Sequence, residues 1–262
     1  MNDRAAVRSG GLAITNPKIM LFALLLVYIL NFLDRQIVNI LAEPIKGELG
    51  LSDTQLGLLA GPAFAVFYAV LGIPIARYAD NAKTNRVWLI SICLAVWSGM
   101  TAICGVAQNF AQLALARIGV GVGEAGCTPA AHSLIADSVP PEKRSSAIAF
   151  FGLGIPIGGL LGLIIGGIVN DQYGWRIALM LVGTPGILLA FLLPLIIRDP
   201  RRCADSAHFN TAGSPVKAKL SIKDAAREVF ASKAYLYVFI AASFTAFLSY
   251  GKGLWTISFF IR

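Results

Sequence analysis

Four charged residues interrupt long apolar stretches of the sequence. Asp34 and Arg35 stand together in the first stretch, and Arg117 and Glu124 stand seven residues apart in a later one. Seven residues make about two turns of a helix, so Arg117 and Glu124 share one face at a separation of about 10 Å along the axis. Carboxylate and guanidinium groups in such surroundings can exchange a proton, bind an anion or neutralise one another.

A glycine-rich string surrounds Glu124. Residues 121–126 read GVGEAG and fit the GxGxxG pattern of phosphate-binding loops. That pattern requires a preceding strand and a soluble strand–turn–helix unit, whereas this string lies within the apolar stretch 110–136, which we predict to be one helix. Glycines in membrane helices instead allow another backbone to approach closely. The string therefore predicts helix packing and no nucleotide site.

The amino-acid composition indicates whether these stretches lie in water or in a membrane. Of the 262 residues, 56% are hydrophobic and 14% are charged, compared with about 45–50% and 25% in soluble domains. Seven apolar stretches are each close to about 20 residues long, the length that a helix needs to cross the hydrocarbon layer. Helices are expected there because a helix satisfies its backbone N–H and C=O groups internally. We predict an all-α polytopic membrane protein with spans at residues 19–42, 55–79, 87–107, 110–136, 145–169, 176–197 and 234–261.

Lys and Arg residues indicate the orientation of the spans. They concentrate in the N-terminal tail, in the links after the second and fourth spans, and after the sixth span. The positive-inside rule then places the N-terminus in the cytoplasm. The net charge of +8 reflects this topology and indicates no nucleic-acid partner, because the charges are spread over several links. The predicted domains are a cytoplasmic tail (1–18), a six-helix bundle (19–198), a cytoplasmic interdomain loop (199–233) and the first helix of a truncated second bundle (234–262).

The end of the interdomain loop, residues 221–230, has the pattern of an amphipathic helix. Ser221 to Asp224 resemble a capping box, and the apolar side chains from Ile222 to Phe230 fall on one helical face. Basic residues flank this face, which suits an anionic membrane surface. A plain linker helix is the alternative.

The four charges inside the spans require an explanation, because a charge at bilayer depth is costly. Insertion scales give at least about 2.5–3.5 kcal/mol, so such side chains usually face a partner or a hydrated cavity. Asp34 and Arg35 lie near the middle of the first span, and we predict that they meet Arg117 and Glu124 in one internal cluster. The alternative is that the charges only fix packing, but apolar residues would pack at lower cost. We therefore interpret the cluster as part of a substrate or proton path.

The spans also suggest an internal repeat. Spans 1–3 and spans 4–6 each begin with a charge-bearing helix, as expected for two inverted three-helix units that line one cavity. The fifth span carries a small-xxx-small stripe of Gly154, Gly158, Gly162 and Gly166. Pro156 within this stripe lacks an N–H and would allow a bend during gating, with simple helix packing as the alternative.

Longer motifs connect these features to a known family. They are LNFLDRQIV (30–38), ARIGVGVGEAG (116–126), PPEKRSSAIAFFGLGIPIGG (140–159) and YGWR (173–176). On these motifs the chain resembles the N-terminal half of a major facilitator superfamily transporter, and more narrowly the bacterial spinster-like members. The resemblance implies two six-helix bundles, of which the C-terminal one is a missing partner, in the inner (plasma) membrane of a bacterium.

The link between the second and third spans departs from the family pattern. The superfamily has a GxxxDRxGRR-like motif, whose Asp and basic partners latch the cytoplasmic helix ends in one conformation. Here Asp80 and Arg86 match that motif, whereas four other positions differ. We expect a cytoplasmic gate that is weaker or rewired, with Arg77, one turn before Asp80, as a substitute partner. A solvated group of topogenic charges is the alternative.

The resemblance also implies an activity, which is secondary active transport of an amphiphilic lipid such as a lysophospholipid or a sphingoid phosphate. We predict proton-coupled alternating access, in which Asp34 or Glu124 holds the proton. Arg35 and Arg117 would meet the anionic headgroup, and the tail would lie along apolar helix faces among membrane lipids. A small organic anion or a drug is the alternative cargo, because arginines recognise any anion.

Two other functional classes are disfavoured. A heptahelical receptor would usually have its N-terminus outside, against the Lys/Arg bias. An enzyme would need a nucleophile with a base or a metal cluster, but His132 and His208 have no companion at ligand spacing, and the cysteines show no CxxC pattern. We therefore predict no catalytic residue, no metal and no cofactor.

Overall fold

A computed structural model describes residues 16–81, 83–202 and 230–261. Every regular element in these residues is helical, which confirms the all-α prediction. The chain divides into two compact units, Met1–Phe209 and Asn210–Arg262, which are described separately. His208 and almost all of the predicted amphipathic helix at 221–230 lie outside the described residues.

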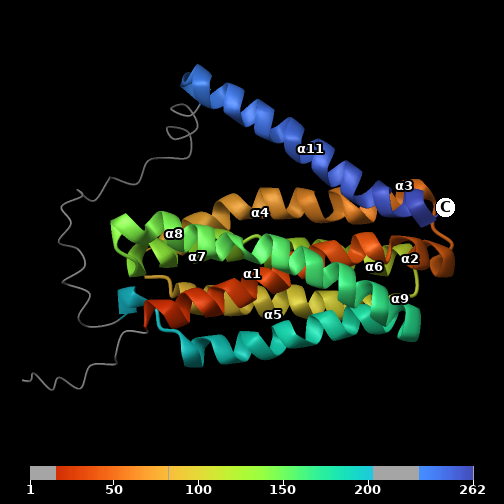
Figure 1. Cartoon of the computed structure of the whole chain (residues 1–262), viewed down its shortest axis with the longest axis horizontal. Coiled ribbons are helices and arrows are strands. Elements are labelled where there is room, and N and C mark those ends of the chain that lie inside the picture. Colours follow the sequence, from red (N-terminus) through yellow and green to blue (C-terminus); the bar gives the residue numbers. More distant parts are fainter. Residues whose placement is uncertain (1–15, 82, 203–229, 262) are drawn as a thin grey trace, which may run out of the picture. The chain divides into compact units, whose positions relative to one another are not determined.

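The first unit is a bundle of helices that run along one another (Figure 1). Its described helices are α1 (Pro17–Ile40), α2 (Ala42–Leu49), α3 (Asp53–Ala60), α4 (Pro62–Asp80), α5 (Arg86–Cys104), α6 (Phe110–Glu124), α7 (Cys127–Ser138), α8 (Pro141–Gly152), α9 (Gly154–Ile196) and the 3-10 helix η1 (Pro200–Arg202). The second unit contains α11 (Lys233–Ile261).

The described helices account for the seven predicted spans. Five stretches are long and apolar enough to cross a membrane, and one of them, 141–196, contains two predicted spans in its 56 residues. The chain turns back within this stretch at Gly174 (Figure 1). Gly174 has a φ of +81°, which residues with a side chain rarely adopt. The remaining predicted span, 110–136, is divided between α6 and α7.

The prediction of one continuous helix over 110–136 is therefore wrong. A two-residue break separates α6 from α7, directly after Glu124. Pro129 has no N–H to donate to the carbonyl of Ala125, so the hydrogen-bond ladder is interrupted at this point. Similar breaks precede Pro62, between α3 and α4, and Pro156, between α8 and α9.

Polar side chains cap the N-termini of several helices. The side chain of Asn16 accepts from a backbone N–H in the first turn of α1, and those of Asn85 and Asn109 do the same for α5 and α6. Ser52 and Gln55 form a reciprocal capping box at the start of α3. These caps satisfy backbone donors that have no partner within the helix, and they set where each helix begins.

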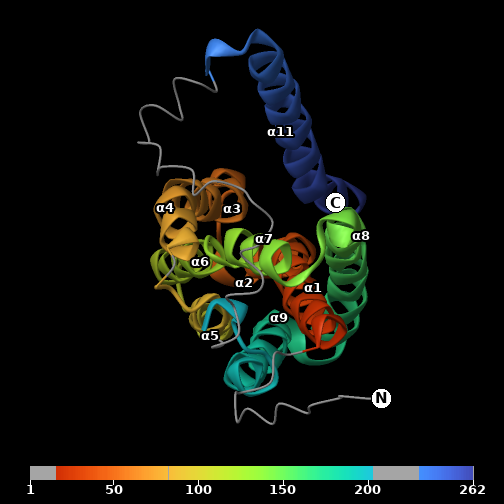
Figure 2. The same ribbon diagram turned by 90° about the vertical axis from the view of Figure 1, so that its left-hand side faces the viewer.

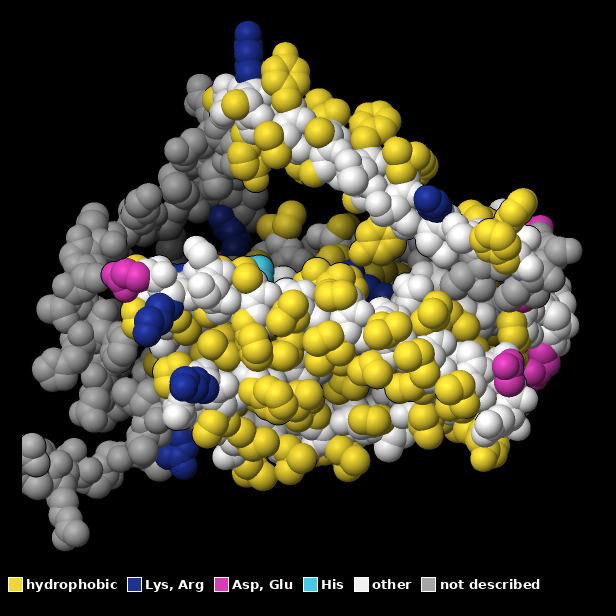
Figure 3. Space-filling view, in the orientation of Figure 1, with side chains coloured by type: hydrophobic (Ala, Val, Ile, Leu, Met, Phe, Trp, Pro, Cys, Tyr) yellow, Lys and Arg dark blue, Asp and Glu magenta, His cyan; other side chains and the backbone are white. Residues whose placement is uncertain are grey.

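The helix α1 is central in the first unit (Figure 2). It packs along both arms of α9, while α5 packs on α9 and α6, and α4 packs on α6. Hydrophobic side chains cover the face of this unit seen in Figure 3, between ends that carry charged groups. Phe191 and Leu195, for example, are 71% and 78% exposed. An apolar exterior around buried polar groups is what a helical bundle in lipid requires, and the chain is a multi-pass membrane protein.

Candidate functional site

The four charges predicted from the sequence lie together between α1 and α6. Asp34 is 2% exposed, Arg117 is 3% exposed and Glu124 is fully buried. Arg35 is the most accessible member, with 15% of its side chain exposed. Arg35, next to Asp34 in the chain, contacts Glu124, and the guanidinium carbons of Arg35 and Arg117 lie 4.9 and 5.5 Å from the centre of the same ring, that of Phe64. The predicted internal cluster is thus present in the fold.

Arg35 links the two helices directly. Its Nε donates a hydrogen bond of 2.7 Å to Oε2 of Glu124. Its guanidinium carbon also lies 4.7 Å from the ring centre of Tyr68, 4.9 Å from that of Phe64 and 5.3 Å from that of Phe32. Aromatic rings attract a cation through their electron-rich faces. The carboxylate of Glu124 and three aromatic rings are thus among the groups that hold Arg35.

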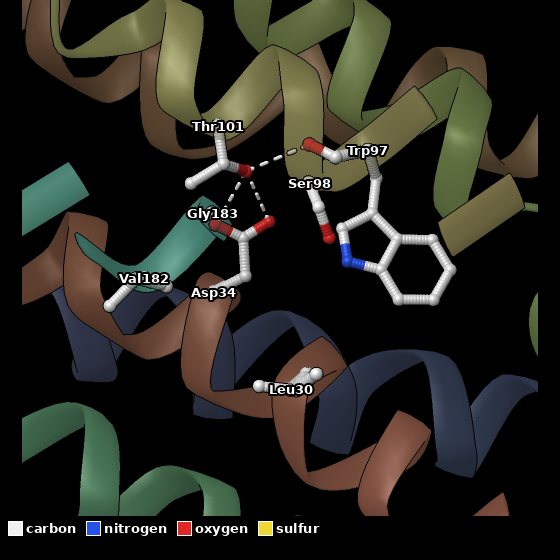
Figure 4. Close-up of a pocket in the computed structure, with 7 residues that line it drawn as sticks. All are labelled: Leu30, Asp34, Trp97, Ser98, Thr101, Val182 and Gly183. Atoms are coloured by element: carbon white, nitrogen blue, oxygen red, sulfur yellow. Dashed lines mark hydrogen bonds between the residues drawn. The ribbon is translucent and has the colours of Figure 1, made fainter. Parts of the chain in front are cut away.

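Asp34 points to α5 instead. The Oγ1 atom of Thr101 lies 2.8 Å from each carboxylate oxygen of Asp34 and 3.0 Å from the carbonyl oxygen of Trp97 (Figure 4). The small pocket around Asp34 is completed by side chains that include Leu30 and Val182, and it leaves no space for a water molecule. Asp34 is thus in dry contact with Thr101, while Arg35 reaches accessible space.

Several polar atoms of this cluster, and of Asn31 about one turn before Asp34 on α1, have no hydrogen-bond partner among the described residues. They are both amide atoms of Asn31, the Nε and Nη1 atoms of Arg117, and Oε1 of Glu124, and all are buried. An unsatisfied buried polar group costs about 1–3 kcal/mol, so most proteins avoid such groups outside functional sites. Arg117 in particular has free donors, and its guanidinium carbon lies 5.5 Å from the ring centre of Phe64.

Glycines bring α6 close enough to form the cluster. A Cβ atom placed on Gly121 would lie 2.6 Å from the carbonyl oxygen of Phe64, and one on Gly123 would lie 2.6 Å from the backbone nitrogen of Trp97. Both positions therefore exclude any side chain. The GxGxxG string packs α6 against α4 and α5, as predicted from its place in an apolar helix.

The glycine stripe on the first arm of α9 packs on α1 in the same way. A Cβ atom on Gly158 would collide with the carbonyl oxygen of Ile29, and one on Gly154 would lie 2.8 Å from the Cβ of Tyr28. Pro156 is in the first turn of α9, directly after the break from α8. The packing of Gly154 and Gly158 is thus visible, and the hinge at Pro156 stays a prediction.

Arg86 is the centre of a second charged cluster, at the ends of α5, α7 and α9. Its guanidinium and backbone N–H donate to both carboxylate oxygens of Asp199 at 2.5–3.0 Å, and its Nη1 donates to Asp137 at 2.7 Å. The same Nη1 donates to the carbonyl oxygen of Ser133 at 2.8 Å. Arg201 then donates to the same oxygen of Asp137, at 2.7 Å. This network joins three helix ends around a fully buried guanidinium.

The other two predicted gate residues lie at the surface. Arg77 and Asp80 are both exposed, and the backbone carbonyl of Asp80 lies 3.5 Å from Nη1 of Arg201. Pairing between their side chains stays a prediction.

Burial by itself would raise the pKa of Asp199, but the hydrogen bonds and the charge of Arg86 outweigh burial and hold that pKa below its usual range.

A third cluster joins α2 to the turn within α9, and it involves the YGWR motif. Nε1 of Trp175 donates to Glu48 at 2.5 Å, and Nε of Arg176 donates to the other carboxylate oxygen at 2.9 Å. Nη1 of Arg176 also donates to the carbonyl oxygens of Gly105 and Ala107 in the link between α5 and α6. Two side chains of one motif thus connect three segments.

We expect Glu48→Gln to cause a modest loss of stability at neutral pH. Hydrogen bonds from Arg176 and Trp175 lower the pKa of Glu48, so its contribution is present above the pKa of the unfolded carboxyl and is lost as pH falls. Exposed ion pairs contribute about 0.2–1 kcal/mol. Thermal unfolding of both proteins should differ at pH 7 and converge below about pH 4. Glu142→Gln, at an exposed acid in α8, is the control and should change the unfolding temperature neither at pH 7 nor at low pH. If the difference between the parent and Glu48→Gln persists at low pH, the role assigned to the ionised carboxylate of Glu48 is contradicted.

The family is evident from comparison with known proteins. Residues 24–261 match the profile of the Major Facilitator Superfamily. The chain belongs to this superfamily.

Relatives within the superfamily are longer than this chain. An MFS-type efflux pump of Mycolicibacterium smegmatis is 42% identical over 192 residues, which are 72% of this chain and 44% of that protein. Protein spinster homolog 1 of Homo sapiens is 30% identical over 261 residues, covering 97% of this chain and 48% of that protein. A crystal structure of a bacterial homologue of the human lysosomal transporter Spinster, inward-facing and unoccupied, aligns with a TM-score of 0.82 at 38% identity, over 94% of this chain and 56% of that chain. The chain spans about half the length of these relatives.

Within this major facilitator fold, sequence reasoning missed the uncharged members of the central site. Phe64 and Tyr68 stand four residues apart in an apolar span, Asn31 is a polar residue near the middle of α1, and Thr101 lies three residues before the end of α5. A polar residue at mid-span depth, such as Asn31, is a usable signal, since hydrocarbon disfavours it. The aromatic residues gave no such signal, because apolar rings are common in any span.

Proposed function

We propose that this chain forms the N-terminal half of a secondary active transporter that works by proton-coupled alternating access. The observation that supports this most is the group of buried charges between α1 and α6, two of which, Arg117 and Glu124, retain polar atoms without a partner among the described residues. A cluster that served packing alone would satisfy its members. The remaining wall of the transport path would come from a C-terminal bundle, which the resemblance to major facilitator transporters implies.

The contact between Asp34 and Thr101 supports proton binding at Asp34. A hydroxyl has one proton and can also accept. When Asp34 is ionised, Thr101 donates to the carboxylate. When Asp34 is protonated, its O–H can donate to Thr101, which then donates to the carbonyl oxygen of Trp97, 3.0 Å away. Both protonation states are thus satisfied without water, so the proton can stay while the surroundings change.

The pair of Arg35 and Glu124 supplies the step that responds to this proton. Ionised Asp34 attracts Arg35 and Arg117, and neutral Asp34 releases this attraction. Arg35 can then favour Glu124 alone or turn toward accessible space. Protonation shifts the balance between the inward-facing and outward-facing states only if Asp34 binds the proton more tightly in one state than in the other. A change in the partner of Arg35 between the two states would produce such a difference in proton affinity.

The substrate that we propose is an amphiphilic lipid with an anionic headgroup, such as a lysophospholipid or a sphingoid phosphate. Arg117 offers buried N–H groups to an anion, and Arg35 is the accessible cation beside them. The lipid class is what the spinster-like resemblance of the sequence motifs implies. The N-terminus would lie in the cytoplasm and the Arg86 cluster would form the cytoplasmic gate, with the protein in a bacterial inner membrane.

Export of a drug or transport of a small organic anion is the second candidate. The efflux pump of Mycolicibacterium smegmatis, at 42% identity, favours it. The rings of Phe32, Phe64 and Tyr68 would also contact a flat aromatic compound. A thermal-shift screen of the full-length protein separates the two, since lysophospholipids and sphingoid phosphates should stabilise it more than short carboxylates or drugs do.

Proton coupling is tested with Asp34→Asn and Glu124→Gln in the full-length protein, reconstituted in vesicles. Transport should depend on pH in the parent protein, and each variant should flatten this dependence. Each variant should also slow transport by about 5–150-fold, which is the factor that typical coupling free energies correspond to. Asp171→Asn, at an exposed acid of α9, is the matched control and should keep the parent profile. An unchanged pH profile in both cluster variants would contradict the proposal.

A further inference from the structure

An apolar crevice lies between α1 and the two arms of α9. Its volume is about 420 Å³, and its ten lining side chains are all Leu, Ile, Val or Pro. Leu26, Leu30 and Leu33 form the floor on α1, Leu161 belongs to the first arm of α9, and Leu181 belongs to the second. No charged or polar side chain is among those described around it, so a headgroup or a polar solute has no partner there.

The crevice lies at the depth of the hydrocarbon layer. Its floor, Leu26 to Leu33, occupies the middle of the 24-residue α1 and extends for about 10 Å along the helix. On the two arms of α9, Leu161 is 36% exposed and Leu181 is 49% exposed, and Leu26 at one end of the floor is 36% exposed, so the crevice is open to the surroundings. At this depth the surroundings of a multi-pass membrane protein are acyl chains.

The size of the crevice matches a flexible hydrocarbon chain. An apolar cavity of about 150 Å³ stays dry and binds benzene, and the same ratio of volume to carbon gives roughly 17 carbon atoms for this crevice. An empty crevice of this size would forfeit dispersion contacts along all of its walls. Its length along the helices suits a chain better than a compact ring.

We propose that this crevice binds one acyl chain of a bilayer lipid. The bound chain lies against Leu30 and Val182, which also line the small pocket of Asp34 (Figure 4). The lipid thereby supports, from the outer side, the dry wall behind a carboxylate of the central cluster. The binding site does not depend on the proposed transport activity, because every lining residue lies outside the charged cluster.

The test is photolabelling of the full-length protein in vesicles that contain phosphatidylcholine with a diazirine in the middle of one acyl chain. Mass spectrometry should find the label concentrated on peptides of α1 and α9 that line the crevice. Leu161→Trp fills part of the space and should reduce this labelling about tenfold, as expected from losing the burial of about two CH₂ groups. Ile165→Phe is a second, smaller filling variant, used if Leu161→Trp does not fold.

The matched control is Leu160→Trp, one residue away on the same helix. Leu160 is 59% exposed and does not line the crevice, so this variant should keep the labelling of the parent. The proposal would be overturned if the crevice were labelled no more strongly than other exposed helix faces. It would also be overturned if the filled variants were labelled as strongly as the parent protein.

Discussion

Gly158→Ala is expected to destabilise the folded protein by about 2–3 kcal/mol, although it adds a single methyl group. The added Cβ would collide with the carbonyl oxygen of Ile29 and would lie 2.9 Å from the Cβ of Phe32. Neither atom is the flexible end of a side chain, so α1 and α9 must move apart. Because α1 carries Asp34 and Arg35, the movement would also displace the charged cluster. The measurement is the free energy of unfolding of the purified protein in mixed micelles.

The neighbouring glycine gives the control for this prediction. A Cβ atom on Gly159 would meet no atom within 4 Å. Gly159→Ala should therefore leave stability unchanged or raise it by about 0.5–1 kcal/mol, because alanine favours helix over glycine. Equal effects of the two substitutions would show that helix propensity, and not the approach of α1, determines the result.

Arg86→Ala is expected to cost about 3–5 kcal/mol, the typical effect of removing one partner from a buried ion pair. The side chains of Arg86 and Asp199 are both fully buried. Without the guanidinium, the carboxylate of Asp199 stays in an apolar environment with few donors. Asp137, which is 38% exposed, can still be solvated. The same unfolding measurement at pH 7 gives the loss.

The effect of Arg86→Ala should depend on pH in a defined direction. The pKa of Asp199 is held below its usual range in the parent, so its contribution to stability is present above about pH 4 and is lost as pH falls through the lowered pKa. In the variant, the backbone N–H groups of residues 86 and 201 still donate to Asp199, but the charge and the side-chain hydrogen bonds of Arg86 are lost, so burial raises the pKa of Asp199 relative to the parent. The difference in stability between the two proteins should thus be largest at neutral pH and shrink in acid.

Arg201→Ala is the control for this second prediction. Arg201 contacts the same carboxylate oxygen of Asp137, but 25% of its side chain is exposed, and surface pairs contribute about 0.2–1 kcal/mol. A loss as large as that of Arg86→Ala, or a loss for Arg86→Ala that does not change with pH, would contradict the assigned role of the pair with Asp199.

The all-helical fold and the four charged members of the central cluster were predictable from the sequence. A membrane span is a local property, since about 20 apolar residues in a row are sufficient to define it. Asp34, Arg35, Arg117 and Glu124 were recognisable because charge is rare at that depth. The close packing at the glycines followed from the same reasoning, because small residues in membrane helices mark contacts between backbones.

The partners of each charge were decided by the tertiary structure. The interruption after Glu124, by contrast, follows from a local feature of the sequence, the missing N–H of Pro129, which the apolar pattern of the span did not register. Asp34 meets Thr101, 67 residues away, and Arg86 meets Asp199, 113 residues away. The type of a residue determines that it needs a partner. Which partner it finds depends on the rotation and spacing of packed helices, and these are set by contacts between segments distant in the chain.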